Sequence, residues 1–216
     1  MNEILVARCK VPHPKILDVA SGTGIHAMEM AQRGAQVTAL EIDSNLCEIT
    51  EGIAKHLGLD LNSTLGDACG IPYAENTFDI VMSKAFFEHV YDVDLALKEQ
   101  IRVLKKGGIL IIEDGNLLNP HTLFDLVFLY PLRTNGKHGG LKWILTKTKV
   151  QKNLYGYLPF GRDEDIKTQF WWRNKIDSFQ GLRLKESCTT SRYTHPTLPV
   201  SLKPFVGRCL VIAKKI

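Results

Sequence analysis

The apolar positions of this chain form short continuous runs, separated by stretches in which apolar residues recur with a helical period. Apolar residues at consecutive positions predict strands that are buried on both faces, as in a parallel sheet. The predicted strands are residues 15–20, 36–42, 61–66, 78–83 and 109–113, and the predicted helices are residues 25–33, 45–57 and 93–105. Strands that alternate with helices predict the α/β class and a doubly wound sheet, whose ligands bind at the carboxyl ends of the strands.

The alternation ends near Gly115. Residues 116–178 contain three prolines, many aromatic residues and two predicted helices, at about 120–130 and 163–178. We interpret this segment as a helical cap inserted after the fifth strand, because its pattern does not continue the sheet. Two last strands are predicted at 182–190 and 207–214. The chain is therefore predicted to be a single domain, residues 1–216, with a core at 15–115, the inserted cap at 116–178 and the last two strands at 179–216.

Composition narrows the class of protein. The chain has 216 residues, of which 44% are apolar, so it can form one ordinary core. No apolar run approaches the roughly 20 residues that cross a bilayer, and the first residues do not have the pattern of a signal peptide. The five cysteines are scattered and include no Cys-x-x-Cys pair, so we expect reduced thiols and no metal site. These features predict a cytoplasmic protein.

Charge is distributed unevenly along the chain. Residues 1–115 hold 10 Lys/Arg against 17 Asp/Glu, whereas residues 116–216 hold 17 against 6. The segment from Arg133 to Lys152 carries six of these cations and no acid. This segment is either a solvated basic face or a surface for an anionic acceptor, a phosphate group or a membrane. Peripheral membrane contact through it is one hypothesis.

The first predicted strand runs into a glycine turn and a helix, Lys15-Ile-Leu-Asp-Val-Ala-Ser-Gly-Thr-Gly24. Gly22 and Gly24 allow the backbone to turn sharply and to approach a ligand, and the following helix presents free N–H groups to an anion. Glu41 ends the second strand, where a carboxylate can accept hydrogen bonds from both hydroxyls of a ribose. The pattern predicts a pocket for an adenosine-containing cofactor. Because it also fits the dinucleotide fingerprint, an NAD(P)-dependent oxidoreductase remains an alternative.

Further motifs follow in a fixed order: Gly66-Asp67-Ala68, Ile71-Pro72-Tyr73, Asn76-Thr77-Phe78-Asp79-Ile80-Val81 and Arg102-Val103-Leu104-Lys105-Lys106-Gly107-Gly108. In this order and spacing, residues 15–114 resemble the class I S-adenosylmethionine-dependent methyltransferases, and most of all their small-molecule branch with quinone- and sterol-type enzymes. Asp18 also fits this family better than a dehydrogenase. The resemblance implies S-adenosylmethionine as the cofactor and a Rossmann-like sheet of seven strands. The last strand, at about 208–214, would be antiparallel.

The resemblance also implies the residues that bind the cofactor. They are Asp18, Ala20, Ser21, Gly22, Thr23, Gly24, Glu41, Ile42, Asp67, Ala68, Ser83 and Lys84. Glu41 would bind the ribose hydroxyls and Ile42 would pack on the adenine. Asp67 would accept a hydrogen bond from the adenine amino group, to which Ala68 adds a backbone N–H.

The methionine end of the cofactor would lie against the loop from Asp18 to Gly24. Ser83 and Lys84 would direct backbone carbonyls toward its ammonium group. The family commonly has glycine where Ala20 stands, and we expect alanine to be tolerated there if the backbone torsions stay negative.

Methyl transfer requires positioning and exclusion of water more than it requires acid–base groups, and it needs no metal. Where the acceptor must lose a proton, His89 is the predicted catalytic base, because it follows the fourth strand and because histidine as a residue type suits proton transfer near neutral pH. The alternative is that His89 only caps or packs a helix. Glu88, His26, His138 and Tyr155 are further candidates for the base.

The acceptor is predicted to be a small molecule, of an anionic, lipid-linked or sugar-linked kind. The apolar run from Leu123 to Tyr130 is either a lid helix packed on the core or a wall for such a molecule. Nucleic acid is disfavoured, since the sequence contains no recognised RNA-binding module. A non-catalytic cofactor-binding protein of the same fold is the third hypothesis.

Overall fold

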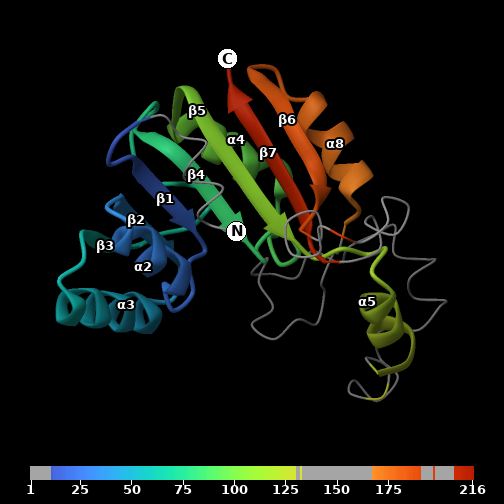
Figure 1. Ribbon diagram of the computed structural model, residues 1–216, viewed down its shortest axis with the longest axis horizontal. Coiled ribbons are helices and arrows are strands. Elements are labelled where there is room, and N and C mark those ends of the chain that lie inside the picture. Colours follow the sequence, from blue (N-terminus) through green and yellow to red (C-terminus); the bar gives the residue numbers. More distant parts are fainter. Residues whose placement is uncertain (1–10, 130–131, 133–166, 191–196, 198–206) are drawn as a thin grey trace.

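A seven-stranded sheet organises the chain (Figure 1). The structure is a computed structural model and describes residues 11–129, 132, 167–190, 197 and 207–216. The strands are β1 (Lys15–Val19), β2 (Gln36–Glu41), β3 (Leu61–Leu65), β4 (Phe78–Lys84), β5 (Leu104–Asp114), β6 (Leu182–Thr189) and β7 (Cys209–Lys215). The helices are α2 (Ile25–Gln32), α3 (Ser44–Leu57), α4 (Val93–Val103), α5 (Pro120–Phe124), the π-helix η1 (Asp125–Leu129) and α8 (Gln169–Asp177).

The strand order is β3-β2-β1-β4-β5-β7-β6. The first five strands pair in parallel, whereas β7 is antiparallel to both of its neighbours, β5 and β6. The chain reverses its direction across the sheet between β1 and β4, which is where ligands of doubly wound sheets bind. The predicted α/β fold of seven strands with an antiparallel last strand is confirmed.

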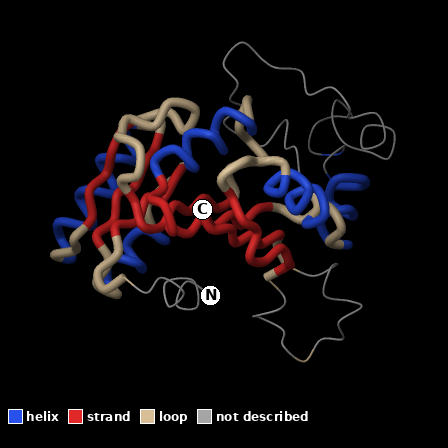
Figure 2. Tube along the Cα trace, turned by 90° about the horizontal axis from the view of Figure 1, so that it is seen from above, coloured by secondary structure: helices blue, strands red, loops and turns tan. Residues whose placement is uncertain are grey.

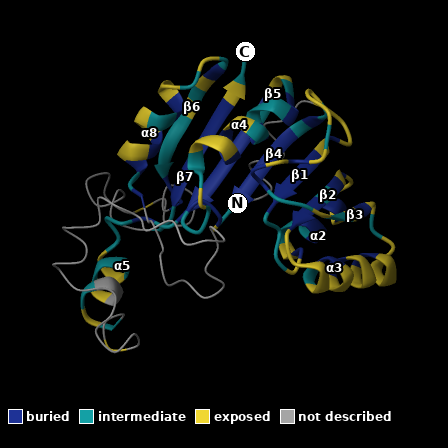
Figure 3. Cartoon of the chain, turned by 180° about the vertical axis from the view of Figure 1, so that it is seen from behind, coloured by how far each residue is buried: buried dark blue, intermediate teal, exposed yellow. Residues whose placement is uncertain are grey.

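Helices cover both faces of the sheet (Figure 2). The helices α2 and α3 pack on β2 and β3, and α4 and α8 pack on strands from β4 to β7. Successive strand residues contribute to two different apolar clusters: Ile16 and Ile80 belong to one, and Leu17 and Val81 to the other. Because side chains alternate across a strand, both faces are apolar and the runs in the sequence are continuous. Figure 3 shows buried strands and an exposed outer side of α3.

Capping residues satisfy both ends of α3 and the start of α4. Asp43 accepts hydrogen bonds from the N–H groups of Asn45 (2.8 Å) and Leu46 (3.4 Å) at the start of α3. Gly58 ends this helix with a left-handed φ of 63°. Asp92 accepts from the N–H of Leu95 at the start of α4, at 3.0 Å. These contacts satisfy backbone groups that a helix end leaves without a partner.

The fifth strand begins earlier than the sequence predicts. Gly107 and Gly108 were expected to separate a helix over 93–105 from a strand over 109–113, but α4 ends at Val103 and β5 begins at Leu104. Both glycines lie in an irregular part of the strand, where the register with β4 shifts. Gly107 has a φ of 78°, and a Cβ on Gly108 would lie 2.9 Å from the carbonyl oxygen of Asp79. The glycines therefore permit a bulge in the strand and do not terminate the helix.

The segment predicted as a cap is described only at its two ends. The helices α5 and η1 extend away from the sheet (Figures 1 and 3), and Phe124 and Phe128 are exposed. By contrast, α8 packs on β6 and β7, where Trp172 is fully buried against the ring of Phe87. The boundaries of the cap stay a prediction, and the basic segment 133–152 lies outside the described residues. Among the helices that the structure describes, none is long and apolar enough to cross a membrane.

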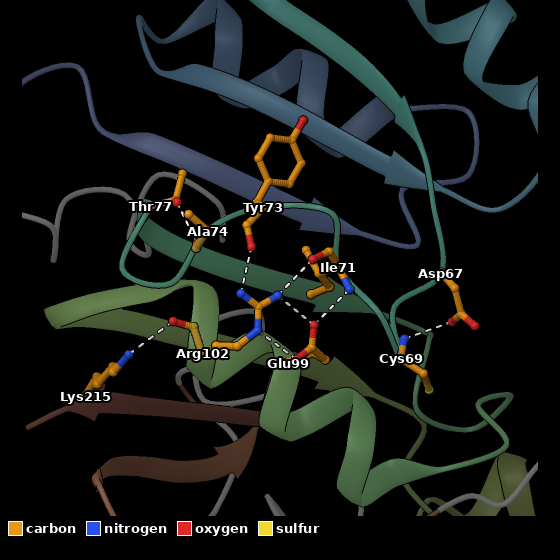
Figure 4. A network of polar contacts seen from close by, with 9 residues as sticks. All are labelled: Asp67, Cys69, Ile71, Tyr73, Ala74, Thr77, Glu99, Arg102 and Lys215. Atoms are coloured by element: carbon orange, nitrogen blue, oxygen red, sulfur yellow. Dashed lines mark hydrogen bonds and ion pairs between the residues drawn. The ribbon is translucent and has the colours of Figure 1, made fainter.

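Arg102 on α4 holds the loop between β3 and β4 in place (Figure 4). Its guanidinium donates to the carbonyl oxygens of Ile71 (2.8 Å) and Tyr73 (2.7 Å). It also forms two hydrogen bonds with the carboxylate of Glu99, at 2.7 and 2.8 Å. Glu99 in turn accepts from the N–H of Ile71 at 2.9 Å. This double contact fixes the backbone of the loop whose first part contains Asp67.

Replacing Arg102 by lysine should lower the free energy of unfolding by about 1–3 kcal/mol, because one ammonium group cannot serve both carbonyls and the carboxylate with the same geometry. Denaturation by urea measures the change. Arg33→Lys is the matched control, since Arg33 forms an exposed pair with Glu29 at 3.3 Å and such pairs contribute less than about 1 kcal/mol. Equal effects of the two substitutions would contradict the structural role of Arg102.

Candidate cofactor site

Parallel pairing brings the carboxyl ends of four strands to one edge of the sheet. Val19 of β1 is paired with Leu40 of β2 and with Ser83 of β4, and Ser83 is paired with Ile112 of β5. The next residues along the chain are polar or small, because beyond the paired residues the backbone leaves the apolar interior. The predicted site residues of the first, second and fourth strands are therefore neighbours.

The turn after β1 has left-handed φ values at three positions: 56° at Ala20, 57° at Gly22 and 72° at Gly24. A Cβ on Gly22 would meet no atom within 4 Å, whereas a Cβ on Gly24 would lie 2.5 Å from Cγ2 of Thr50 on α3. Gly24 is thus needed for close packing of two helices, and Gly22 faces open space where a ligand can approach.

The condition under which alanine was expected to be tolerated, negative backbone torsions at Ala20, is not met. Alanine occupies a left-handed conformation here, which costs roughly 1–2 kcal/mol for an L-residue with a Cβ. The turn forces this conformation, since Gly24 donates to the carbonyl oxygen of Ser21 (3.0 Å) and Ser21 donates to that of Leu40 (3.1 Å). The resemblance gave one signal of this left-handed conformation, because the related family commonly has glycine where Ala20 stands.

Glu41 is fixed at the end of β2 by backbone N–H groups. Its Oε2 accepts from Gly22 at 2.7 Å, and its Oε1 accepts from Ile42 at 2.9 Å and from Asp43 at 3.3 Å. Glu41 is 7% exposed and the neighbouring Ile42 is 43% exposed. The carboxylate therefore connects the glycine turn to the second strand, next to an apolar side chain that is open to solvent.

Asp67 follows β3 and is held by a second set of contacts. Its Oδ1 accepts from the N–H of Cys69 at 2.8 Å, and its Oδ2 accepts from the hydroxyl of Tyr91 at 3.3 Å. Ala68, beside it, is buried. No sequence motif connects Tyr91 with a residue 24 positions earlier, so only the fold brings Tyr91 and Asp67 together.

Among the described residues, Oδ2 of Asp18, Oγ of Ser21 and Oγ of Ser83 are buried at this edge without a hydrogen-bond partner, and Oε2 of Glu113 has only its ion pair with Lys84. Buried polar atoms rarely stay without partners, so their convergence indicates a site for a polar ligand. Asp18, Ser21 and Lys84 line a cavity of about 140 Å³ together with other residues. The other lining residues are Ala20, His26, Ala85, Glu113 and Arg208.

Burial raises the pKa of Asp18 to about 7, with Lys84 opposing the shift and Glu41 adding to it. Lys84 itself forms an ion pair with Glu113 at 3.3 Å. Burial, and then Lys84, lower the pKa of His26 below its usual range, so His26 is a neutral ring in the wall of the cavity. A cationic ligand group beside Asp18 would stabilise its carboxylate.

His89 lies after β4 but is not among the residues that line this cavity. Its Nε2 is 3.7 Å from Oε1 of Glu88, and its backbone N–H donates to the carbonyl oxygen of Phe86 at 2.9 Å. The ring is 31% exposed. His138 and Tyr155, two other candidate bases, lie outside the described residues.

A larger cavity of about 540 Å³ lies at the opposite edge of the sheet, at the starts of β4 and β5. It has an apolar floor that includes Ile109 and Ile212, and four lysines line it. None of the buried oxygen atoms without partners belongs to its lining residues. The smaller cavity is therefore the better candidate for the cofactor site, in spite of its size.

The chain is similar in sequence to proteins named as methyltransferases. Residues 17–112 match the profile of a family described as "Methyltransferase domain". The chain is 32% identical over 146 residues to a demethylmenaquinone methyltransferase of Thermobifida fusca, covering 66% of this chain and 58% of that protein. It is 38% identical over 108 residues to the ubiquinone/menaquinone biosynthesis C-methyltransferase UbiE of Agrobacterium fabrum, covering 48% and 42%. The chain thus spans about half the length of the curated relatives it matches.

Solved structures share the fold. A SAM-dependent methyltransferase from Aquifex aeolicus superposes with a TM-score of 0.63 at 15% identity, covering 100% of this chain and 89% of that one. A Haloferax volcanii putative methyltransferase, solved with the Trm112 activator, has a TM-score of 0.69 at 15% identity and coverages of 99% and 88%. At such low identity these similarities concern the fold alone.

Ala20→Gly should raise the free energy of unfolding by about 1 kcal/mol, because glycine adopts the left-handed conformation of the turn without a Cβ clash. The matched control is Ala31→Gly in the last turn of α2, which should lower the free energy of unfolding, because glycine gives the unfolded chain more backbone freedom. Urea denaturation of both variants measures the difference. A loss of stability in both would show that the left-handed φ at Ala20 carries no strain.

Proposed function

We propose that this chain, which carries the methyltransferase domain of the class I S-adenosylmethionine-dependent methyltransferases at residues 17–112, transfers a methyl group to a small-molecule acceptor. The observation that carries the proposal is Glu41, whose carboxylate the N–H of Gly22 holds beside open space at the end of β2. A carboxylate in this place suits the two hydroxyls of a ribose. The relatives named as methyltransferases support the same reaction.

In this proposal the predicted residues would contact the cofactor from its adenine to its methionine end. At the ribose, Glu41 would accept two hydrogen bonds, and the exposed side chain of Ile42 would cover one face of the adenine. Asp67 would accept from the adenine amino group, with the N–H of Ala68 beside it. Asp18 and the backbone after Ser83 would surround the ammonium of the methionine end, where buried oxygen atoms have no partner.

S-adenosylmethionine, when bound, supplies a methyl group on a sulfonium that a nucleophile can displace in line. The protein would position the two reactants and exclude water from them. The glycine turn would hold one end of the cofactor, and the residues after β4 would border the acceptor. His89 would take a proton from the acceptor, with Glu88 at 3.7 Å to orient its ring. The names of the relatives suggest a quinol as acceptor, whose hydroxyl such a base could deprotonate.

Calorimetric titration of the chain with S-adenosylhomocysteine tests the cofactor, with NAD and NADH as parallel ligands. We expect micromolar binding of S-adenosylhomocysteine alone. Glu41→Ala should weaken it at least tenfold, because the carboxylate and its fixed position are lost. Glu48→Ala, an exposed residue of α3, is the control and should bind normally. Binding of NAD instead would favour the oxidoreductase, and binding of neither ligand would contradict the proposed pocket.

The affinity for S-adenosylhomocysteine should rise as the pH rises from 6 to 8. In the free protein Asp18 has a pKa of about 7. A ligand ammonium beside it favours the ionised form, so binding at lower pH requires loss of a proton and affinity falls by up to about tenfold per pH unit. Titrations at several pH values should show this slope in the natural chain and a flat profile in Asp18→Asn. A slope that survives in the variant would assign the pH dependence to another group.

His89→Gln should lower kcat for a short-chain demethylmenaquinol by about 10²–10⁴-fold, because the acceptor then keeps its proton. Transfer of a labelled methyl group measures the rate. Binding of S-adenosylhomocysteine should stay within about twofold, since His89 is not in the wall of the cofactor cavity. His56→Gln, on the exposed side of α3, is the matched control. Transfer at the normal rate in His89→Gln would exclude His89 as the base.

A further inference from the structure

A row of alternating charges connects the cofactor cavity with His89. The ammonium of Lys84 is 3.3 Å from Oε2 of Glu113, and Oε1 of Glu113 is 3.9 Å from Nε of Arg208. Nη2 of Arg208 is 3.3 Å from Oε1 of Glu88, the same oxygen that lies 3.7 Å from Nε2 of His89. The row begins in the wall of the cavity and ends at a half-exposed ring.

Arg208 is the centre of this row. The side chains of Glu88 and Glu113 are each only 11% exposed, and a cation between two carboxylates offsets the repulsion between them. Arg208 contacts both, one through Nε and the other through Nη2. A planar guanidinium presents its donors in a fixed fork, so it holds the two carboxylates in a defined relation.

The backbone of Arg208 is anchored as well. Its N–H donates to Oγ1 of Thr190 at 2.9 Å, and its carbonyl oxygen accepts from the N–H of Thr190 at 2.8 Å. The loop that bears Glu88 has its own anchor, since the N–H of Phe86 donates to Oδ1 of Asp114 at 3.1 Å. The side-chain contact between Arg208 and Glu88 therefore joins two fixed pieces of backbone that are 120 positions apart.

We propose that Arg208 is a positioning residue for the Glu88–His89 pair. Arg208 holds the carboxylate of Glu88, and Glu88 orients the ring of His89 toward the acceptor. The inference rests on the proposed function, because the orientation of the His89 ring matters only if His89 is the base. It adds the residue just before β7 to a reaction centre whose other parts follow β1, β2 and β4.

The other charges around Glu88 make the effect of Arg208 predictable. Burial, followed by Glu88, raises the pKa of Asp114 to about 8, so Asp114 carries little negative charge at neutral pH. Lys167 lies near Asp114 and Lys84 pairs with Glu113, so both stay in place when Arg208 is changed. Loss of Arg208 leaves the negative charge of Glu88 to act on His89 alone. The protonated ring is then favoured and the pKa of His89 should rise.

The experiment is an NMR titration of the histidine rings in the whole chain, with the His89 signals assigned through His89→Gln. In Arg208→Gln we expect the pKa of His89 to rise by about 0.5–1 unit. Arg208→Lys keeps the charge and should reduce the change to less than half of that. Arg183→Gln, an exposed arginine on β6, is the matched control and should leave the titration unchanged.

A double-mutant cycle with Glu88→Gln isolates the contact. If Arg208 acts through Glu88, then Arg208→Gln should not shift the pKa of His89 further in the Glu88→Gln background. An equal shift in both backgrounds, or no shift in the single variant, overturns the proposal. A variant that does not fold is replaced by Arg208→Lys, for which the cycle makes the same prediction with a smaller amplitude.

Failure of the proposed function gives a different result. If the chain transfers no methyl group or His89→Gln keeps full activity, the base is wrong whatever the titrations give. If His89 is the base, the acid limb of the pH profile of kcat should move upward in Arg208→Gln by the same amount as the pKa of His89. A purely structural role of Arg208 would lower kcat at all pH values and leave this limb in place.

Discussion

The site depends on the parallel pairing of β1 with both β2 and β4. The sheet is apolar on both faces, so polar side chains are excluded from its middle and collect where the strands end. Because the registers align Val19 with Leu40 and with Ser83, these ends coincide at one edge. A shift of one residue in either pairing would move every side chain of a strand to the other face and separate the groups that form the pocket.

The polar groups buried at this edge differ in how many hydrogen-bond partners the fold gives them. Glu41 receives three backbone hydrogen bonds and is satisfied before any ligand arrives. Asp18 is not, since burial raises its pKa to about 7 and one of its oxygen atoms has no partner. The preformed part of the pocket is therefore the end at Glu41. The end with unmet polar groups is where a charged ligand group contributes most to binding.

Elements that come late in the chain contribute to the site that the residues after β1 begin. The antiparallel strand β7 brings Arg208 to the residues after β4, and α4 fixes the loop of Asp67 through Arg102. The fold itself is shared with solved methyltransferases at about 15% identity, so it carries no information about the acceptor. Under the proposed function, the acceptor side would be formed by side chains such as Glu88, His89 and Arg208.

The sequence by itself determined the strands, the order of strands and helices and the glycine turn, because these follow from local burial patterns and from conformations that only certain residues adopt easily. It also determined that Glu41 ends a strand next to that turn. The start of β5, the left-handed Ala20 and the role of Gly107 were decided by the tertiary structure, since each depends on the register of a neighbouring strand or loop. Tyr91 with Asp67, and Arg208 with Glu88, could not be predicted because contacts across 24 and 120 positions leave no local pattern.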